Sequence, residues 1–349
     1  MIGAVENFTA GVEVEIGKID RELKKLWLES GGVTRASLIN LAVYCGEQSM
    51  EANTELISEI TRNHACRAIL IANDPTGQLK DVRAWISAHC HISRAGAKQV
   101  CSEQISFLLP MGSNSLIPNI VFSHLDSDLP LYLWWQGEFP SDEEMPLLKW
   151  VDRLIFDSHD WKHCADSLCA LPDRINAFRK RLTFRDINWT RSLLFRQALA
   201  RFFDNPDNLP ALYELSKIHF DYSPGFRSLA ALIVGWLASH LGWKIGAGYA
   251  IAPDGSEIAI TLEEKEGAAL SGGLLEAGAR KFVLGRQGKS DFLKGEVYCE
   301  DGRSYEFLLP AGSDDTLSMI NVELGRGSGH QKYLESLDAA LPLLSSQKT

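Results

Sequence analysis

Apolar residues in the first half of the chain fall into short runs separated by amphipathic stretches. A short apolar run predicts a buried strand, and apolar spacings of three and four predict a helix that covers it. We therefore expect strands at residues 37–45, 66–74, 81–93, 99–110, 129–135 and 152–158, with helices at 50–64, 113–125 and 141–151. The strands at 81–93 and 99–110 are long and alternate in polarity, which predicts an antiparallel pair.

The second half repeats this style of pattern. It predicts strands at 211–222, 243–252, 256–264, 279–286, 293–300 and 304–310, with helices at 223–242 and 331–344. Between the halves, Asn188 is a suitable cap for a helix that ends near Asp204, before a turn-rich segment. Phe195, Leu199 and Phe202 form its apolar stripe.

Residues 12–28 form an amphipathic helix candidate, because Ile16, Ile19, Leu23 and Leu26 fall on one face. A helix of this kind either lies on its own domain or offers its apolar face to a partner. The pattern alone leaves both open. The basic run 174–185 is similarly open: it is a solvated face or a docking strip for an acidic partner.

The order of these elements predicts an α/β fold with mixed sheets, in which two α/β domains are joined by a helical bridge. We expect the following division: an N-terminal helix at 1–29, a first domain at 30–160, the bridge at 161–208 and a second domain at 209–349. The heptapeptides "FLLPMGS" at 107–113 and "FLLPAGS" at 307–313 each follow a strand and precede a helix candidate. This match suggests the hypothesis of an internal duplication.

The composition of the chain limits the classes of partner that it is expected to bind. The chain has 349 residues, a formal net charge of -10 and 23% charged residues, which argues against nucleic acid as a partner because phosphate binding needs a cationic face. The start shows no signal-peptide pattern, and Ser239 and His240 interrupt the longest apolar stretch, so we expect no membrane span. Seven scattered cysteines predict reduced thiols in a cytoplasmic protein, with Cys101 and Cys299 dispensable for folding.

Motifs of catalysis are missing from the sequence. It contains no G-x-S-x-G, H-E-x-x-H, C-x-x-C or G-x-x-x-x-G-K-[ST] pattern, so we expect a protein that is not an enzyme and needs no cofactor. His159, His163, Cys164 and Cys169 lie close together, but structural zinc sites use tighter cysteine pairs, and we expect no metal.

A phosphate could still bind at a helix start. Candidates are Ser113 after Gly112 and Ser313 after Gly312, and a weaker one is the glycine-rich stretch around Gly327. These positions support the alternative hypothesis of a sugar-phosphate or nucleotide sensor or enzyme.

Two adjacent tryptophans, Trp134 and Trp135, end the strand 129–135. Neighbouring side chains in a strand point to opposite faces, so the two rings either seal helices onto both faces or bring one ring to the surface. Tryptophan and arginine dominate the hot spots of protein interfaces. The partner-binding candidates are therefore Trp134, Trp135, Trp189, Arg191 and Arg196. Arg191 lies near the predicted helix start, where the dipole disfavours a cation, which suggests a specific carboxylate partner.

Several of these segments resemble the OpcA family of glucose-6-phosphate dehydrogenase assembly or activator proteins. They are "TRASLINLAVYC", "CRAILI", "CSEQISFLLPMG", "DLPLYLWWQGEFP", "VDRLIFDS" and "NWTRSLLFRQALARFFD", in that order, and they span about residues 30–205. The sequence departs from the family pattern at Ser102, where a second cysteine is often expected, and around Phe195 and Arg196, where Pro-Trp-Arg is often expected.

The resemblance implies a non-catalytic partner of glucose-6-phosphate dehydrogenase. Such a protein helps the dehydrogenase to assemble or raises its activity, and in some photosynthetic bacteria this is linked to thiol redox state. The implied partner is the dehydrogenase itself, and the implied mechanism is protein–protein binding.

Overall fold

The computed structural model describes residues 11–29, 34–92, 99–141, 145–176, 178, 181–286, 291–325 and 330–345. The chain separates into two compact units, each built from three segments. Unit 1 comprises Met1–Phe156, Phe178–Arg185 and Ile320–Gly327, and unit 2 comprises Asp157–Ala177, Asp186–Met319 and Ser328–Thr349. Within the described ranges, no helix is both long enough and apolar enough to cross a membrane.

The elements up to the end of the first sheet are, in chain order, β1 (Val12–Val14), η1 (Ile16–Lys18), α1 (Ile19–Glu29), β2 (Thr34–Arg35), β3 (Ile39–Gly46), η2 (Glu47–Ser49), α2 (Met50–Thr61), β4 (Cys66–Asn73), β5 (Arg83–Ile92), β6 (Gln99–Leu109), η3 (Asn114–Leu116), α3 (Ile117–His124), β7 (Leu131–Trp135), α4 (Met145–Leu148), β8 (Arg153–Phe156), η4 (Ser158–Asp160), α5 (Cys164–Ile175) and β9 (Thr183–Asp186).

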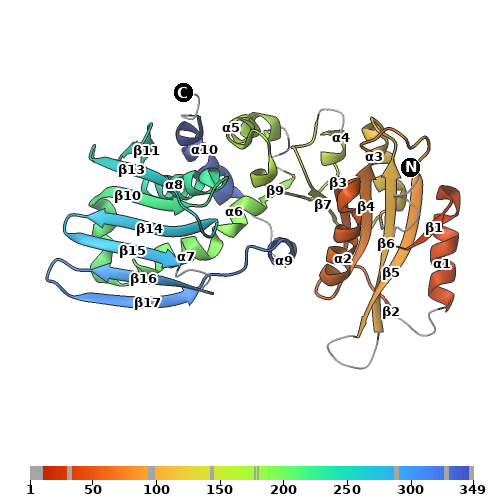
Figure 1. Cartoon of the computed structure of the whole chain (residues 1–349), viewed down its shortest axis with the longest axis horizontal. Coiled ribbons are helices and arrows are strands. Elements are labelled where there is room, and N and C mark those ends of the chain that lie inside the picture. The colour runs from red at the N-terminus through yellow and green to blue at the C-terminus, as the bar shows by residue number, and fades with distance from the viewer. Residues whose placement is uncertain are drawn as a thin grey trace. The chain divides into compact units, whose positions relative to one another are not determined.

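The remaining elements are α6 (Ile187–Arg191), α7 (Leu193–Arg201), η5 (Pro206–Tyr213), β10 (Leu215–Tyr222), α8 (Arg227–Leu241), β11 (Lys244–Ile245), β12 (Tyr249–Ile251), β13 (Glu257–Glu264), β14 (Leu270–Ala277), β15 (Arg280–Arg286), β16 (Phe292–Tyr298), β17 (Ser304–Pro310), α9 (Thr316–Gly325) and α10 (Gln331–Ser345). The predicted α/β fold with mixed sheets is confirmed (Figure 1).

The sheet of unit 1 has the strand order β1-β5-β6-β4-β3-β7-β8-β9, with β2 paired to β6. Its central strands β6, β4, β3, β7 and β8 run parallel, whereas β5 pairs antiparallel to β6 as the alternating pattern predicted. The parallel strands carry near-continuous buried runs, which is expected of strands covered on both faces. This sheet forms the core of the unit.

The N-terminal helix begins later in the chain than the pattern predicted. Strand β1 precedes the helix and pairs antiparallel with β5, so α1 begins only at Ile19. Ile19 and Leu23 are buried, and the Trp27 indole donates a hydrogen bond to the buried Glu103 carboxylate of β6. Ile19 and Leu23 of the predicted apolar face therefore lie on their own unit, whereas Ile16 is 46% exposed.

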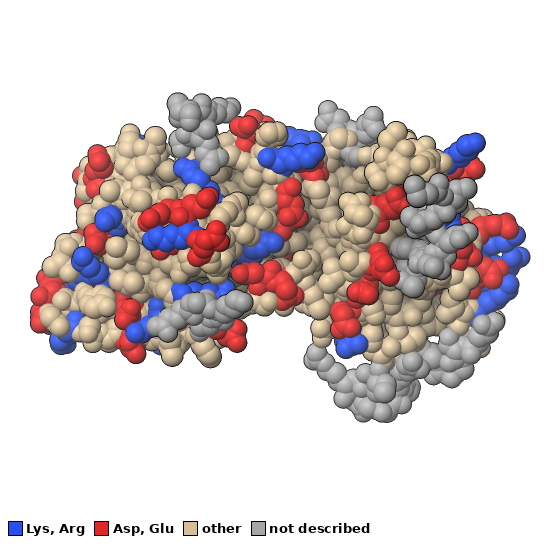
Figure 2. All heavy atoms as spheres, viewed as in Figure 1, with Lys and Arg blue, Asp and Glu red and all other residues tan. Residues whose placement is uncertain are grey.

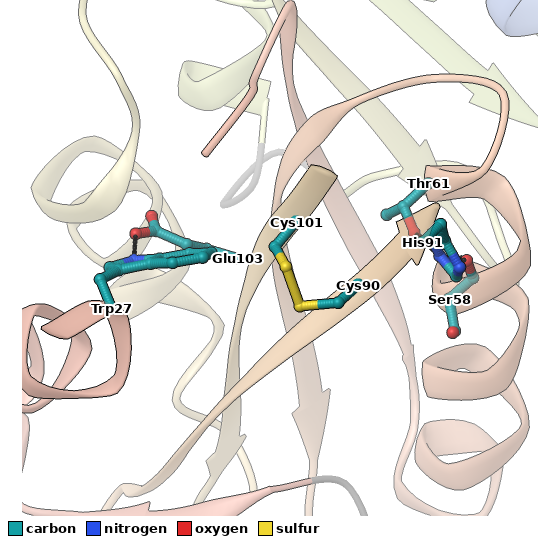
Figure 3. The surroundings of a disulfide bond; sticks show 7 residues. All are labelled: Trp27, Ser58, Thr61, Cys90, His91, Cys101 and Glu103. Atoms are coloured by element: carbon teal, nitrogen blue, oxygen red, sulfur yellow. Dashed lines mark hydrogen bonds between the residues drawn. A yellow bond between two sulfur atoms is a disulfide. The ribbon is translucent and has the colours of Figure 1, made fainter. Parts of the chain in front are cut away.

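Cys90 and Cys101 form a disulfide, which overturns the expectation that all seven thiols are reduced (Figure 3). The two residues lie directly opposite each other in the antiparallel pair β5 and β6, with their Cα atoms 4.1 Å apart. Cross-strand neighbours at this spacing are close enough for their sulfurs to join. The free cysteines are Cys45, Cys66, Cys164, Cys169 and Cys299.

The sheet of unit 2 has the order β11-β12-β13-β10-β14-β15-β16-β17 and is antiparallel except for the pair β10 and β13. Helices α7 and α8 contact one of its faces, and α10 packs on α8. Gly112 and Gly312 both take positive φ angles, +77° and +78°, at the two matching corners. The strand orders of the two sheets nevertheless differ, so the topology gives no support to an internal duplication.

The segment expected to be a helical bridge does not form a separate body. It contains α5, α6 and α7, which belong to unit 2, and also β9, which adds a strand to the first sheet. The apolar side chains Leu168, Leu171 and Ile175 of α5 are buried, which ties that helix to a core instead of leaving it as a linker. In the view of Figure 2, basic and acidic side chains are interspersed over the surface.

Helices α8 and α10 approach each other closely at Gly235. A Cβ atom built at this glycine would lie 2.1 Å from the backbone oxygen of Ser336 and 2.9 Å from the Cβ atom of Ala340. No real Cβ tolerates such a contact with backbone, so the glycine sets the distance between the two helices.

Replacing Gly235 with alanine therefore tests the packing of α8 on α10. In an exposed helix this change stabilises by about 1 kcal/mol, because alanine is the better helix former. Here we expect the opposite sign, a loss of about 1–3 kcal/mol from overpacking. Chemical denaturation measures the free energy of unfolding, and a variant as stable as the wild type would contradict the close approach.

Reduction of the Cys90–Cys101 disulfide is expected to lower the free energy of unfolding by about 2–3 kcal/mol, because the crosslink restricts the unfolded chain. The measurement is a denaturant titration with and without reductant, and Cys299→Ser is the matched control. Mass spectrometry of alkylated protein should find one crosslinked peptide pair in the oxidised sample. Seven alkylated cysteines would show instead that the thiols are reduced.

Candidate functional site

The structure places Trp134 and Trp135 in the core of unit 1. Each is only 3% exposed, and because they are neighbours in β7 they fill opposite faces of the sheet. The indole of Trp135 donates to the carbonyl of Glu138 at 2.7 Å and stacks on Tyr44 at 3.9 Å between ring centroids. Both tryptophans therefore close the core at the end of β7, and neither offers a surface to a partner.

Trp189 and Arg196 lie together in unit 2. Trp189 is 7% exposed, and the guanidinium of Arg196 lies 3.6 Å from the centroid of its ring. The Arg196 Nε donates to the hydroxyl of Ser192 at 2.9 Å. This cation–π contact covers the indole and fixes the arginine, so the pair is part of the packing of α6 and α7.

Arg191 has a carboxylate partner within the chain. Its two terminal nitrogens donate to the two carboxylate oxygens of Asp157 at 2.8 and 2.5 Å, and both side chains are largely buried. The expectation that Arg191 lies near the start of a long helix is wrong. The helix breaks at Ser192, and Arg191 is the last residue of α6. A cation at the C-terminal end of a helix is favourable.

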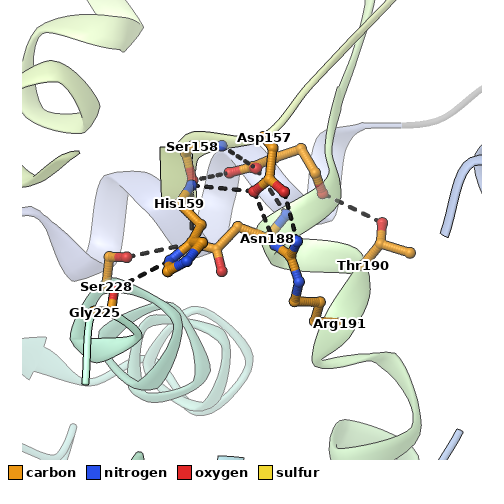
Figure 4. A network of polar contacts seen from close by, with 9 residues as sticks. Asp157, Ser158, His159, Asn188, Thr190, Arg191, Gly225 and Ser228 are labelled. Carbon is orange, nitrogen blue, oxygen red and sulfur yellow. Dashed lines mark hydrogen bonds and ion pairs between the residues drawn. The ribbon is translucent and has the colours of Figure 1, made fainter. Parts of the chain in front are cut away.

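A buried polar network surrounds this ion pair (Figure 4). Its centre is the carboxylate of Asp186, which accepts hydrogen bonds from the backbone nitrogens of Ser158 and Asn188, from the Ser158 hydroxyl and from the Tyr333 hydroxyl. Burial raises the pKa of Asp186 to about 7, and the charge of Asp157 adds to the rise. Asn188 in turn donates to the hydroxyls of Ser158 and Ser228.

A cavity of about 470 Å³ adjoins the network in unit 2. The first residues of α5 and α8 line it, so two helix N-termini face the same space. Its charged and titratable lining residues are His159, Lys162, His163, Cys164, Asp166, Arg227 and Glu264. His159 is stacked on Phe226, with ring centroids 3.9 Å apart, and faces the carbonyl of Gly225.

The residues that line the cavity give little support for catalysis or metal binding. Burial raises the pKa of the Cys164 thiol to about 11, so the thiolate that a nucleophile requires is scarce at neutral pH. Among the described residues, the group of three or more potential metal ligands is His219, Asp221 and Glu263, which lies elsewhere. There the ammonium of Lys265 already lies 2.8 Å from Asp221 and 3.2 Å from Glu263, in the place a metal cation would take.

The predicted phosphate-binding positions differ in their surroundings. Ser113 caps η3 without a side-chain hydrogen bond, and the helix α3 that follows is short. Ser313 donates to the carboxylate of Asp315, and Asp315 accepts from the backbone nitrogen of Ser318 at 2.8 Å. The start of α9 therefore already holds an anion of its own. Gly327 lies outside the described residues.

Two structural features were not predicted from the sequence: a pair of buried carboxylates and an exposed tryptophan. Asp157 and Asp186 stand at the ends of β8 and β9, and an acidic residue directly after a buried strand was the available signal for Asp157. No such signal existed for Asp186, because its strand was not predicted. The other feature is Trp150, which is 66% exposed, although tryptophan is usually buried.

Comparison with known proteins gives matches to both halves of the chain. A family model described as the N-terminal domain of a glucose-6-phosphate dehydrogenase subunit matches residues 57–172, and a second, described as the C-terminal domain of that subunit, matches residues 183–304. A protein of Nostoc punctiforme named "Putative OxPP cycle protein OpcA" is 29% identical over 195 residues, which are 54% of this chain and 40% of that protein. A Synechocystis protein of the same name is 28% identical over 190 residues, 53% of this chain and 38% of that protein.

The matched region thus spans about two-fifths of the length of these curated relatives. A solved structure of an aldose-aldose oxidoreductase from Caulobacter crescentus superposes with a TM-score of 0.44 at 10% identity, covering 89% of this chain and 98% of the other. At that TM-score the superposition is too loose to carry an argument. The two family models, matched in order along the sequence, lead to one conclusion: the chain belongs to the OpcA family.

Proposed function

We propose that this protein is a non-catalytic assembly subunit of glucose-6-phosphate dehydrogenase, and that it raises the activity of the dehydrogenase in the cytoplasm by binding to it. The observation that carries the proposal is the match of both family models, which describe domains of a subunit of that enzyme, to residues 57–172 and 183–304. The three curated relatives also bear the name OpcA.

The interior of unit 2 supports a non-catalytic role. The Asp186 carboxylate has four hydrogen-bond donors and is fully buried, so it has no free lone pair directed at a substrate. Its neighbour Asp157 is engaged by both terminal nitrogens of Arg191. Groups held in this way stabilise a fold, whereas a general base needs access to the proton that it removes.

A binding role requires an exposed anchor, and unit 1 offers one. Trp150, 66% exposed, forms an edge-to-face contact with Phe122, which is 39% exposed, with 5.8 Å between the ring centroids. The neighbouring side chains Leu147, Leu148 and Val151 are buried, so the helical turn at α4 presents Trp150 outward while it anchors itself inward. Tryptophan is among the residues most enriched in interface hot spots. We propose that this pair contacts the dehydrogenase.

The residues that the sequence predicted for partner binding make contacts within the chain. Trp134, Trp135 and Trp189 are buried, and Arg191 and Arg196 are held by contacts within unit 2. Their role in activation is therefore indirect: Trp134 and Trp135 keep unit 1 folded, and the other three keep unit 2 folded.

Trp150→Ala tests the proposed contact with the dehydrogenase. A hot-spot tryptophan contributes at least about 2 kcal/mol, so the complex should bind about 30-fold more weakly, and activation should require correspondingly more protein. The melting temperature should stay near that of the wild type because the side chain is mostly exposed. The matched control is Leu28→Ala, which removes an 82% exposed side chain from α1 and should change neither quantity.

The outcomes separate the contact from the function. Wild-type protein that neither co-purifies with the dehydrogenase nor raises its activity would refute the proposed function. Binding by the wild type together with full activity of Trp150→Ala would refute only the choice of this surface.

Arg191→Ala tests the structural role of the buried ion pair. Loss of one partner leaves Asp157 charged and unpaired, which should lower the free energy of unfolding by about 3 kcal/mol. The control is Arg201→Ala, which breaks the exposed pair Arg201–Asp204 and should cost less than about 0.5 kcal/mol. Activation should fall only in proportion to the unfolded fraction. Unchanged stability with lost activation would instead place Arg191 on the interface.

A further inference from the structure

Three potential metal ligands come together on the sheet of unit 2, near the end of its parallel pair of strands. His219 and Asp221 alternate with the buried residues of β10, so their side chains share the opposite face of the sheet. Glu263 of β13 lies directly beside Asp221 in the parallel register. The register of the two strands therefore brings one imidazole and two carboxylates to the same place.

The ligand atoms of these residues are close enough to share one ion. The Nε2 atom of His219 lies 2.7 Å from Oδ1 of Asp221 and 3.4 Å from Oε2 of Glu263. Each residue offers one ligand atom, and the three atoms lie within 4.8 Å of one another. Tetrahedral zinc with bonds of ~2.1 Å holds its ligand atoms ~3.4 Å apart. Small rotations of the side chains therefore suffice to place the three atoms around a single cation.

A cation that belongs to the chain itself lies between the two carboxylates. The Nζ atom of Lys265 is 2.8 Å from Oδ1 of Asp221 and 3.2 Å from Oε2 of Glu263. One ammonium beside two carboxylates leaves a negative charge unbalanced, whereas a divalent cation in its place balances both. The Lys265 side chain is 45% exposed, so its ammonium can turn into the solvent when another cation arrives.

The neighbouring strand leaves room for one of the carboxylates. Gly272 of β14 lies opposite Asp221 in the antiparallel register, and a Cβ atom built there would lie 2.6 Å from Oδ2 of Asp221. The backbone of Gly272 does not have a positive φ, so its conformation alone does not call for glycine. The missing side chain instead allows the Asp221 carboxylate to lie over the strand, beside the imidazole.

The set of donor atoms indicates the kind of ion. Calcium and magnesium prefer oxygen ligands alone, whereas an imidazole together with carboxylates suits zinc and similar transition metals. We propose that His219, Asp221 and Glu263 bind a divalent transition-metal ion such as zinc in place of the lysine ammonium, with a fourth position open to water. The neutral imidazole with its proton on Nδ1 offers Nε2 to the ion. The ion joins β10 to β13, and this site does not depend on the proposed binding of the dehydrogenase.

The test is equilibrium dialysis of the full chain against zinc chloride at neutral pH, after removal of metal with a chelator and alkylation of the accessible thiols. The wild type should bind a single zinc ion, and zinc should raise its melting temperature. Asp221→Asn removes a charged ligand and should weaken binding about 100-fold or more. Gly272→Ala pushes the Asp221 carboxylate aside and should weaken binding about 10-fold, as does the loss of groups that only orient a ligand.

Lys265→Met tests whether the ion takes the place of the ammonium. The change removes the competing charge and keeps the length of the side chain. It should tighten zinc binding about 5-fold, because the ion no longer has to displace two partly exposed ammonium–carboxylate contacts. The matched control is Lys281→Met, which breaks the 3.1 Å pair with Glu276 on the same sheet and should leave the zinc affinity unchanged.

Three outcomes would overturn the proposal. The first is a wild type that binds no zinc at millimolar concentrations, and the second is binding that Asp221→Asn and Gly272→Ala both leave unchanged, because the ion then lies elsewhere. The third is equal affinity of Lys265→Met and the wild type. Melting temperatures without zinc show whether each variant is folded, and if Asp221→Asn is unfolded, Gly272→Ala and Lys265→Met decide.

Discussion

The fold of unit 2 depends on the hydrogen bonds that the carboxylate of Asp186 accepts. That unit is built from three separate stretches of chain, and Asp186 accepts a hydrogen bond from each: from Ser158 in the first, from Asn188 in the second and from Tyr333 in the third. A buried carboxylate is costly unless its lone pairs are satisfied. The cost is met only when all three stretches are in place, so the network favours the complete arrangement over any partial one.

The same network shows how polar residues gathered in one place can be held by contacts within the fold. Serine, histidine, cysteine and aspartate all occur within a few residues of η4 and α5, and in a sequence this invites a catalytic interpretation. In the structure, the carboxylates are bound by Arg191 and by backbone donors, and the pKa of Cys164 is raised. The polar atoms are turned toward one another within unit 2.

Much of the fold follows from hydrophobic pattern. Most strands of both sheets, the antiparallel pair β5 and β6 and the helices α2, α3, α8 and α10 were predicted, because each has an apolar or periodic segment bounded by turn residues. Strands β1, β2 and β14 were not predicted. The stripe of Phe195, Leu199 and Phe202 is buried as expected. Strand β9 escaped prediction because four residues within a basic stretch give no periodicity.

The misses have local physical causes. The helix expected from Asn188 to Asp204 is broken because the Ser192 hydroxyl bonds back to the carbonyl of Trp189, which competes with helical hydrogen bonding. The Cys90–Cys101 disulfide depends on strand register, and pattern alone does not determine register. The adjacent tryptophans were placed correctly on opposite faces, but a sequence cannot say whether a face is covered. That is also why the exposure of Trp150 emerged only from the structure.

The interleaving of the two units along the chain bears on the order in which they can form during synthesis. Unit 1 includes residues 320–325, and unit 2 includes residues 330–345, among them Tyr333. On a ribosome, which delivers the chain from its N-terminus, neither unit can close its last contacts until these residues have emerged. Proteins usually fold domain by domain as each leaves the ribosome. Here both units must wait for the same stretch of chain, so a chain that has not yet reached it exposes two unfinished cores.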